Sequence, residues 1–532
     1  MRYRGDRGIL ILTLLFLLLF TGVVLNYYRI SEDGAYISAA VNSPYITVNA
    51  GDSQGTVYDR EMRPLVNCGH EWVCVIVPDG KTDAEAMENA VDKEEFAADY
   101  AKGRPFAYRC RESGKDTDRK TYFRIPVRYG ESQTAQHVIG YLSEGKGASG
   151  IEYAYEKILR SGSIGNTVSY TTDGRGNVLI GEGKRVQRSS KEKTGVVTTL
   201  DKEIQAVCES FSREIEKGTV IVSDIGSGDI LGLASYPQYS ADNIEAALTD
   251  GDSPLIDRAL YSYSVGSIFK LVTACEALDE GMGGFVYDCK GSIDISGQVF
   301  NCHRYDGHGV QDMTEAVANS CNTYFISLSR CLDIPKLRGT AYDMGFGKEI
   351  PLCSGITASA GHLPTVEELL VPAELANFSF GQGKLTASPL QINRMTAAIA
   401  NGGKLYMSRL IKGITADGET VSNEKLKQYT RVMGEIQAKK LRDMMISAVY
   451  DTEGSNAKPQ RVKVGAKTST AQTGRMDERG EEFCHAWITG FYPADKPRYA
   501  VTVLVEDGGY GNDAAAPVFA EIADRIMVSG DA

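Results

Sequence analysis

An uncharged apolar stretch near the N-terminus, from Ile9 to Leu25, constrains this chain most strongly. The stretch is dominated by Leu, Ile and Phe, and Tyr27 and Tyr28 follow it. A helix that crosses a bilayer needs about 17–25 such residues, and tyrosines are common where the helix leaves the lipid. The sequence therefore predicts one transmembrane helix over residues 9–28, after a short tail over residues 1–8.

The arginines before this stretch indicate its orientation. Cytoplasmic segments beside a transmembrane helix carry an excess of Lys and Arg, so Arg2, Arg4 and Arg7 favour a cytoplasmic N-terminus. A cleaved signal peptide is the alternative, but its apolar core has about 7–15 residues and small residues follow it closely. The first candidate cleavage site, the small residues at 38–40, lies too far downstream. We therefore expect a single-pass protein of the cell membrane whose chain from residue 29 onward is extracytoplasmic.

A second feature, the stretch YSVGSIFKLVTACEALDEG, is typical of a serine nucleophile at the start of a buried helix. Apolar residues recur at three- and four-residue intervals after Ser267, which predicts a helix that ends near Gly281. Side chains three residues apart on a helix are neighbours, so the Lys270 amine can reach the Ser267 hydroxyl. A desolvated lysine can take the proton of a serine hydroxyl and activate it. The spacing alone is common by chance, so companion motifs are needed.

Two companion motifs follow in order. Ser320 and Asn322 form a Ser-x-Asn element, and Lys467-Thr468-Ser469-Thr470 lies in VKVGAKTSTAQTG. Such a set marks penicillin-binding proteins and class A β-lactamases. With these motifs, and with further matching stretches at 373–403 and 485–493, the chain resembles the class B penicillin-binding proteins. These are membrane-anchored D,D-transpeptidases of the bacterial cell wall.

The resemblance implies an α+β fold, a penicillin-binding, β-lactamase-like transpeptidase domain in which helices flank an antiparallel sheet. The sequence agrees, since strand patterns lie near both ends of residues 196–532 and helical patterns lie between them. Residues 29–195 are charge-rich and are expected to form a non-catalytic pedestal and interaction module. GKGASG at 145–150 satisfies Gly-x-Gly-x-x-Gly, but no buried strand precedes it. We interpret its glycines as turn residues rather than as a nucleotide site.

The resemblance also implies a role for each reactive side chain. Ser267 attacks the carbonyl between the two terminal D-alanines of a peptidoglycan stem peptide, with Lys270 as general base. The acyl-enzyme then passes its peptide to an amine on a neighbouring stem. Ser320 relays a proton to the leaving amine, and Asn322 holds Lys270 or the substrate amide.

The later motif is expected to bind substrate. Lys467 and Thr468 lie on a predicted edge strand, which can pair with an extended peptide while a cation and a hydroxyl receive its carboxylate. The resemblance implies an oxyanion hole formed by the backbone N–H groups of Ser267 and Thr470. Ser469 departs from the family pattern, which has glycine there for close backbone approach. Its side chain either crowds the substrate or is accommodated by a small strand shift, and we expect an active enzyme because all reactive side chains are retained.

Eleven cysteines in 532 residues are too sparse for a disulfide scaffold. Cys289 and Cys302 flank a predicted hairpin and could form a disulfide in an exported domain, although free thiols are an equal alternative. Cys302, His303 and His308 match no strong zinc-ligand spacing, so no metal site is expected. No cofactor is expected either.

The net charge of −12, with no clustered basic surface, argues against nucleic-acid binding. The resemblance implies D-Ala-D-Ala stem peptides as substrates, β-lactam antibiotics as covalent inhibitors and a membrane glycan polymerase as partner. The alternatives are hydrolysis, as a D,D-carboxypeptidase or β-lactamase, and a non-turnover β-lactam sensor or structural partner. No deacylating base is recognisable, and the short tail leaves no room for a signalling module. The sequence does not tell whether the protein serves elongation, division or sporulation. It does not identify the acceptor amine either.

Overall fold

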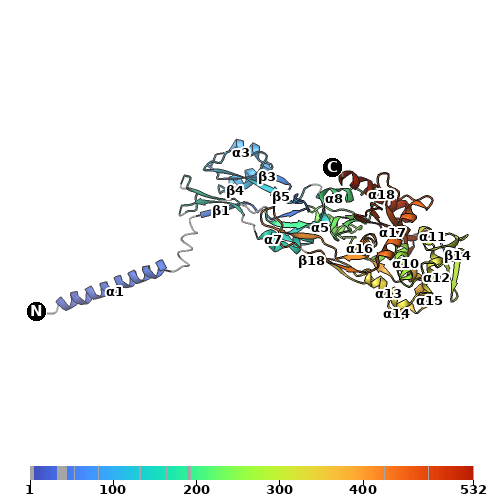
Figure 1. Ribbon diagram of the computed structural model, residues 1–532. Helices are drawn as coiled ribbons and strands as arrows, with labels where there is room; N and C mark the ends of the chain where they lie inside the picture. Colours follow the sequence, from blue (N-terminus) through green and yellow to red (C-terminus); the bar gives the residue numbers. More distant parts are fainter. Residues whose placement is uncertain are drawn as a thin grey trace. The chain divides into compact units, whose positions relative to one another are not determined.

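Figure 1 shows the chain in a computed structural model. The structure describes residues 5–32, 45–52, 54–81, 83–130, 133–161, 165–173, 175–181, 183–188, 193–424, 426–476 and 478–530. Arg2, Arg4 and the small residues at 38–40 lie outside these ranges. Helix α1 (Gly5–Glu32) contains a window, Leu10–Arg29, with a mean hydropathy of 2.3 and no buried residues. This helix is long and apolar enough to cross a membrane.

The chain divides into two compact units, but not at one boundary. Residues 54–69 and 127–162 belong with 191–532, whereas 1–53, 70–126 and 163–190 form the other unit. Strand pairing explains why this division differs from the expected cut between 195 and 196. Strand β2 (Thr56–Tyr58) pairs in parallel with β10 (Gly195–Thr198), so an early segment is built into the C-terminal unit.

The smaller unit contains two three-stranded sheets with the orders β1-β8-β9 and β4-β3-β5. Within β3, Val73 and Val75 lie in one core, while Cys74 and Ile76 lie in another. Successive side chains of a strand point to opposite faces, so β3 is shared by both cores. The elements of this unit are β1 (Tyr45–Gly51), β3 (Gly69–Ile76), α3 (Ala84–Asn89), α4 (Lys93–Ala101), β4 (Phe106–Cys110), β5 (Lys120–Val127), β8 (Asn166–Thr171) and β9 (Lys184–Gln187).

The larger unit is built on a five-stranded antiparallel sheet with the order β12-β11-β26-β25-β24. In the central strand, Val501 and Val503 pack on one face, while Ala500 and Leu504 pack on the other. Both faces are buried, which explains the continuous apolar run YAVTVLV. The strands predicted at both ends of this region are confirmed as β11 (Gly218–Asp224), β12 (Ile230–Tyr236), β24 (Gly465–Met476), β25 (Glu482–Tyr492) and β26 (Tyr499–Val505).

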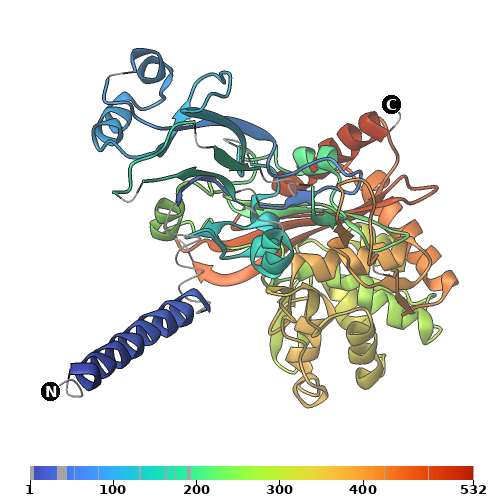
Figure 2. The same cartoon turned by 90° about the vertical axis from the view of Figure 1, so that its left-hand side faces the viewer.

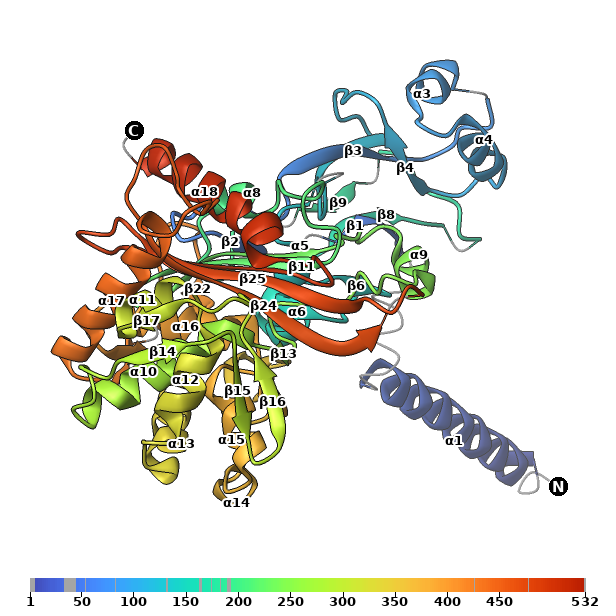
Figure 3. The same cartoon turned by 90° about the vertical axis from the view of Figure 1, so that its right-hand side faces the viewer.

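Helices cover both faces of this sheet (Figures 2 and 3). One face carries α8 (Lys202–Cys208) and α18 (Gly511–Gly530), and the other carries α16 (Pro389–Ala400) and α17 (Glu435–Tyr450). Helix α10 (Lys270–Asp279) packs in the second layer against α17. The predicted α+β fold, an antiparallel sheet flanked by helices, is confirmed, and β24 is an edge strand as expected.

The glycines at 145–150 lie around a hairpin formed by two short strands, β6 and β7, which agrees with their interpretation as turn residues.

The remaining elements of the larger unit are short. These elements are α5 (Gln136–Ile139), β6 (Leu142–Ser143), β7 (Lys146–Gly147), α6 (Gly150–Ala154), α7 (Glu156–Arg160), α9 (Ile244–Thr249), β13 (Tyr263–Ser264), β14 (Tyr287–Cys289), β15 (Ser292–Ile295), β16 (Gln298–Asn301), β17 (Gly309–Gln311), α11 (Met313–Ala318), α12 (Asn322–Ser329), α13 (Ile334–Asp343), β18 (Ile350–Cys353), β19 (Ile356–Ala358), α14 (Val366–Leu369), α15 (Pro372–Ser379), β20 (Thr386–Ala387), β21 (Lys404–Tyr406), β22 (Ile411–Thr415) and β23 (Tyr429–Arg431).

The hairpin predicted between two cysteines is present as β15 with β16, but the disulfide is not. Cys289 belongs to β14 and lies opposite Gly309 of β17, whereas Cys302 follows β16. Both cysteines are free thiols, so the disulfide alternative is wrong for this structure. The hairpin lies between the two cysteines and Cys289 pairs in another ladder, so the hairpin does not place Cys289 opposite Cys302.

Candidate active site

Ser267 lies in a short 3-10 turn, Gly266–Phe269, directly before α10. Gly266 has a φ of 64°, which lies in the left-handed region that favours glycine. The helix that follows ends at Asp279, close to the predicted end near Gly281. Its first residue is Lys270, so the turn and the helix place nucleophile and amine side by side.

The Lys270 side chain joins the first two motifs. Its Nζ lies 3.0 Å from Ser267 Oγ, 3.1 Å from Ser320 Oγ and 2.7 Å from Asn322 Oδ1. It also donates to the Ser320 carbonyl oxygen at 2.6 Å. One buried amine therefore contacts the hydroxyls of both serines, which makes a direct proton path between them available.

Burial changes the charge state of this amine. Lys270 is fully buried, and this burial, reinforced by the positive charge of Lys467, lowers its pKa to about 7. Thiolate charge on Cys321 or Cys302 would act in the opposite direction. Near neutral pH a large fraction of Lys270 is therefore the free base, which can accept the proton of Ser267.

The Ser-x-Asn element forms the tight turn between α11 and α12. Ser320 has a φ of 52°, an uncommon value for a residue other than glycine. Cys321 is the N-cap residue of α12, but its side chain caps no backbone N–H, and Asn322 is the first helical residue. The turn points two polar side chains at Lys270 while the thiol between them is buried.

The edge strand β24 carries the third motif. Lys467 is almost fully buried, and burial lowers its pKa to about 8. Lys467 and Ala466 are successive residues of this strand, so their side chains point to opposite faces. Thr468 is partly exposed, whereas the hydroxyl of Thr470 accepts a hydrogen bond from the Gly511 N–H at 3.2 Å.

Three contacts fix the backbone immediately before Ser267. Trp487 Nε1 donates to the Ser264 carbonyl at 3.1 Å, and Ser469 Oγ donates to the Val265 carbonyl at 2.9 Å. The Gly266 N–H donates to the Gly381 carbonyl at 2.8 Å. The hydroxyl of Ser469 therefore makes a hydrogen bond to the backbone of the turn that carries Ser267.

The backbone of this turn also lies against β24. A Cβ on Gly266 would come within 3.1 Å of the Thr470 carbonyl oxygen and 3.2 Å of Ala471 Cα. Ser267 and Thr470 therefore lie on adjoining segments. Their assignment as oxyanion-hole donors stays a prediction.

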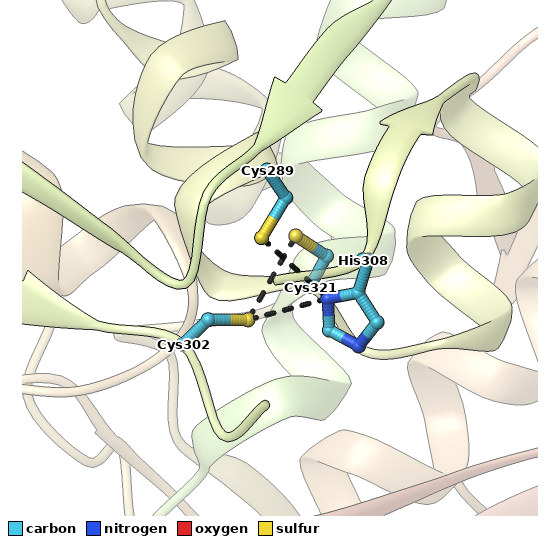
Figure 4. Close-up of side chains that lie close together, drawn as sticks. All are labelled: Cys289, Cys302, His308 and Cys321. Carbon is cyan, nitrogen blue, oxygen red and sulfur yellow. Dashed lines mark hydrogen bonds between the residues drawn. The ribbon is translucent and has the colours of Figure 1, made fainter. Parts of the chain in front are cut away.

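Sequence reasoning missed three features of this site. The matching stretches at 373–403 and 485–493 were the only signals for Gly381 and Trp487, whose contacts require the folded chain. The third feature is a Cys–His cluster of potential metal ligands, formed by Cys289, Cys302, His308 and Cys321 (Figure 4). Its members are spread over three segments of the chain, so the local spacing used for zinc sites could not identify it.

Comparisons with known proteins agree with this arrangement. The model of the family "Penicillin binding protein transpeptidase domain" matches residues 218–524. The chain is 29% identical over 409 residues to stage V sporulation protein D of Bacillus subtilis. This match covers 73% of this chain and 61% of that protein. It is also 29% identical over 435 residues to the peptidoglycan D,D-transpeptidase PbpA of Mycolicibacterium smegmatis, with 74% of this chain and 83% of the relative covered.

A solved structure has the same fold. The chain resembles, with a TM-score of 0.69 and 23% identity, a structure described as "Structural coordination of polymerization and crosslinking by a peptidoglycan synthase complex". This similarity covers 97% of this chain and 98% of the solved chain. Because the family model matches more than half of the sequence, the chain belongs to the penicillin-binding protein transpeptidase family, as a class B member.

Proposed function

We propose that this chain is a serine-type peptidoglycan D,D-transpeptidase that β-lactams inhibit covalently. The observation that carries the proposal is the Lys270 amine, which lies within hydrogen-bond distance of both Ser267 Oγ and Ser320 Oγ. The name of the Mycolicibacterium relative supports the same reaction class.

Acylation follows from this geometry. Ser267 Oγ attacks the carbonyl between the terminal D-alanines, and its proton passes to Lys270 Nζ. The peptide C–N bond then breaks, and a proton delivered through Ser320 leaves with the amine of D-alanine. The resulting ester on Ser267 holds the rest of the stem peptide.

Transfer reverses these proton movements. An amine of a second stem attacks the ester carbonyl, loses a proton through Ser320 and Lys270, and Ser267 regains its hydrogen. Backbone N–H groups of Ser267 and Thr470 stabilise the oxyanion, and each such donor contributes roughly 3–4 kcal/mol. Lys467 and Thr468 bind the carboxylate of the donor peptide.

The membrane arrangement is part of the proposal. Helix α1 anchors the chain in a single pass, with residues 1–8 in the cytoplasm and the catalytic motifs outside. The smaller unit, after helix α1, acts as the non-catalytic pedestal, and the larger unit, which carries all three motifs, acts as the transpeptidase domain. The description of the similar solved structure as a peptidoglycan synthase complex supports a membrane glycan polymerase as partner.

Fluorescent penicillin tests the acylation chemistry. The full chain in detergent should take up one stable label, and Ser267→Ala should take up none. An unlabelled wild-type chain would contradict the proposal, and rapid label loss would favour a hydrolase. A donor and acceptor peptide assay then separates a transpeptidase from a non-turnover sensor, because only the former makes a cross-linked product.

The rate of acylation should depend on pH in a bell-shaped manner. The lowered pKa of Lys270 means that its free base is gained as pH rises through about 7, so the rate rises there. Lys467 loses its charge as pH rises through about 8, so carboxylate binding weakens. The two apparent pKa values belong to the coupled pair of lysines. Lys467→Ala should therefore move the acidic limb of the rate profile to higher pH and abolish the alkaline limb. A flat profile of label uptake against pH would contradict these assignments.

Restoring glycine at position 469 should change stability more than rate. Ser469→Gly removes the side-chain hydrogen bond to the Val265 carbonyl, which costs about 0.5–1.5 kcal/mol of unfolding free energy. Acylation should stay within about tenfold of wild type, because the hydroxyl faces the protein backbone. Denaturant unfolding and label uptake measure the two effects. A large gain in acylation rate would show that Ser469 obstructs the ligand instead.

A further inference from the structure

A pocket of about 380 Å³ lies among α13, α16, β18, β21 and β23 of the larger unit. Helices α13 and α16 and strand β18 are labelled in Figure 1. None of its described lining residues belongs to the three catalytic motifs. Pockets that bind small molecules have about 300–1,000 Å³, with apolar walls and a few polar groups. Buried Ile350 and Leu405 and the more exposed Met407 supply apolar walls here, so the pocket has the size and surface of a ligand site.

Arg394 is the charged residue at the base of this proposal. Of the 12 residues in α16 Arg394 alone is charged, and all the others are buried. Its Nε donates to the Tyr406 carbonyl oxygen, and its two terminal nitrogens have no partner in the part of the chain that the structure describes. Burial lowers the pKa of Arg394 to about 10, so it keeps its charge at neutral pH. A charge among buried residues is costly unless an anion pairs with it.

Lys348 adds a second positive charge to the lining. Its Nζ lies 3.9 Å from the centroid of the Tyr342 ring. Burial lowers the pKa of Lys348, Asp343 opposes this shift, and repulsion from Arg394 adds to it. An anionic group that contacts both cations would remove their repulsion. A carboxylate suits this place, since a guanidinium binds it through two parallel hydrogen bonds.

Two acidic residues on the same lining indicate that the ligand also carries a positive charge. Asp343 and Glu349 line the pocket and are exposed. Arg431 offsets them little, because it donates to the Gly402 carbonyl at 3.0 Å and pairs with Glu435. These carboxylates repel a phosphate or any other pure anion, whereas a zwitterion pairs with both kinds of charge. The lining therefore favours a zwitterion.

We propose that this pocket binds a short zwitterionic peptide, whose carboxylate contacts Arg394 and Lys348 and whose ammonium group contacts Asp343 and Glu349. The side chains of the peptide pack on the apolar walls. Such peptides come from the cell wall, with D-residues, or from proteins, with L-residues. The site lies apart from Ser267, so the proposal does not rest on the proposed function.

Calorimetric titration of the full chain in detergent tests the site, in a Ser267→Ala background that excludes reaction with the probes. The probes are D-alanyl-D-alanine and L-alanyl-L-leucine, and at least one should bind with a Kd of about 1 mM or less. The N-acetyl derivative and the amide of that dipeptide, which lack the ammonium or the carboxylate group, should bind at least about tenfold more weakly. No binding of either dipeptide up to about 10 mM overturns the proposal, as does equal binding of the derivatives.

A matched pair of arginine variants locates the bound dipeptide. Arg338 is also a partly buried arginine whose Nε donates to a backbone carbonyl, that of Pro364 at 2.8 Å, but it lies outside the pocket lining. Arg394→Met should weaken binding at least about tenfold, and Arg338→Met should leave it unchanged. Equal affinities in the two variants would place the dipeptide elsewhere on the chain and overturn the proposal.

The exposed acidic residues give a test that does not depend on the folding of Arg394→Met. The double variant Asp343→Asn with Glu349→Gln should weaken binding of the dipeptide severalfold, because the ammonium group loses its partners. The same variant should bind the N-acetyl derivative as well as before or more tightly, because the carboxylate then meets less negative charge. An unchanged affinity for the dipeptide, or equal weakening of both ligands, overturns the assignment of a zwitterion.

Discussion

Replacing Lys270 with methionine is expected to slow the acylation of Ser267 by penicillin about 10²–10⁴-fold. Lys270 is fully buried, and its Nζ contacts both Ser267 Oγ and Ser320 Oγ. Methionine has a similar length and no base, so the packing of the site should be kept while proton transfer is lost. The rate of label uptake, measured on the full chain in detergent, gives the effect directly.

A surface lysine provides the control for this experiment. Lys290 is exposed and pairs with Asp288, so Lys290→Met should label at the wild-type rate. Thermal unfolding of both variants shows whether Lys270→Met is folded. Wild-type labelling by a folded Lys270→Met chain would remove Lys270 from the role of base.

Replacing Gly381 with alanine is expected to slow acylation about 100-fold, although the residue carries no reactive group. A Cβ at this position would overlap the Gly266 carbonyl oxygen and lie 2.8 Å from Phe269 Cβ. The substitution would also strain the hydrogen bond from the Gly266 N–H to the Gly381 carbonyl. The turn that holds Ser267 must then move, and a nucleophile displaced by about 1 Å loses much of its rate.

Gly281 is the matched control for Gly381. Its φ of 77° is close to the 81° of Gly381, but a Cβ there would meet nothing within 4 Å. Both alanine variants therefore carry the same left-handed strain, of about 1–2 kcal/mol, and only one displaces the turn. Equal labelling rates, measured at a temperature where both variants are folded, would show that the overlap at Gly266 has no effect on Ser267.

The sequence predicted the elements whose signals are local. The periodicity after Ser267 predicted the helix that ends at Asp279, and strand patterns near both ends of residues 196–532 predicted the strands of the central sheet. The spacing of Ser267 and Lys270 was sufficient to predict their contact, because residues three apart on a helix are neighbours.

Other features depend on contacts between distant segments and had no local signal. The pairing of β2 with β10 moved residues 54–69 into the C-terminal unit. Ser469 was expected to face the substrate or shift its strand, but its hydroxyl binds the Val265 carbonyl. The Cys–His cluster was missed because Cys321 was read only as the middle of a catalytic motif. In each of these places tertiary packing, rather than local pattern, decides the role of the residue.

The most direct test of the central claim is a peptide map of the acyl-enzyme formed with a donor stem peptide that ends in D-Ala-D-Ala. Mass spectrometry should find the donor on Ser267, with one D-alanine lost, and an added acceptor amine should convert this adduct into a cross-linked peptide. No adduct, or an adduct on a residue other than Ser267, would contradict the claim that Ser267 is the nucleophile of a transpeptidase.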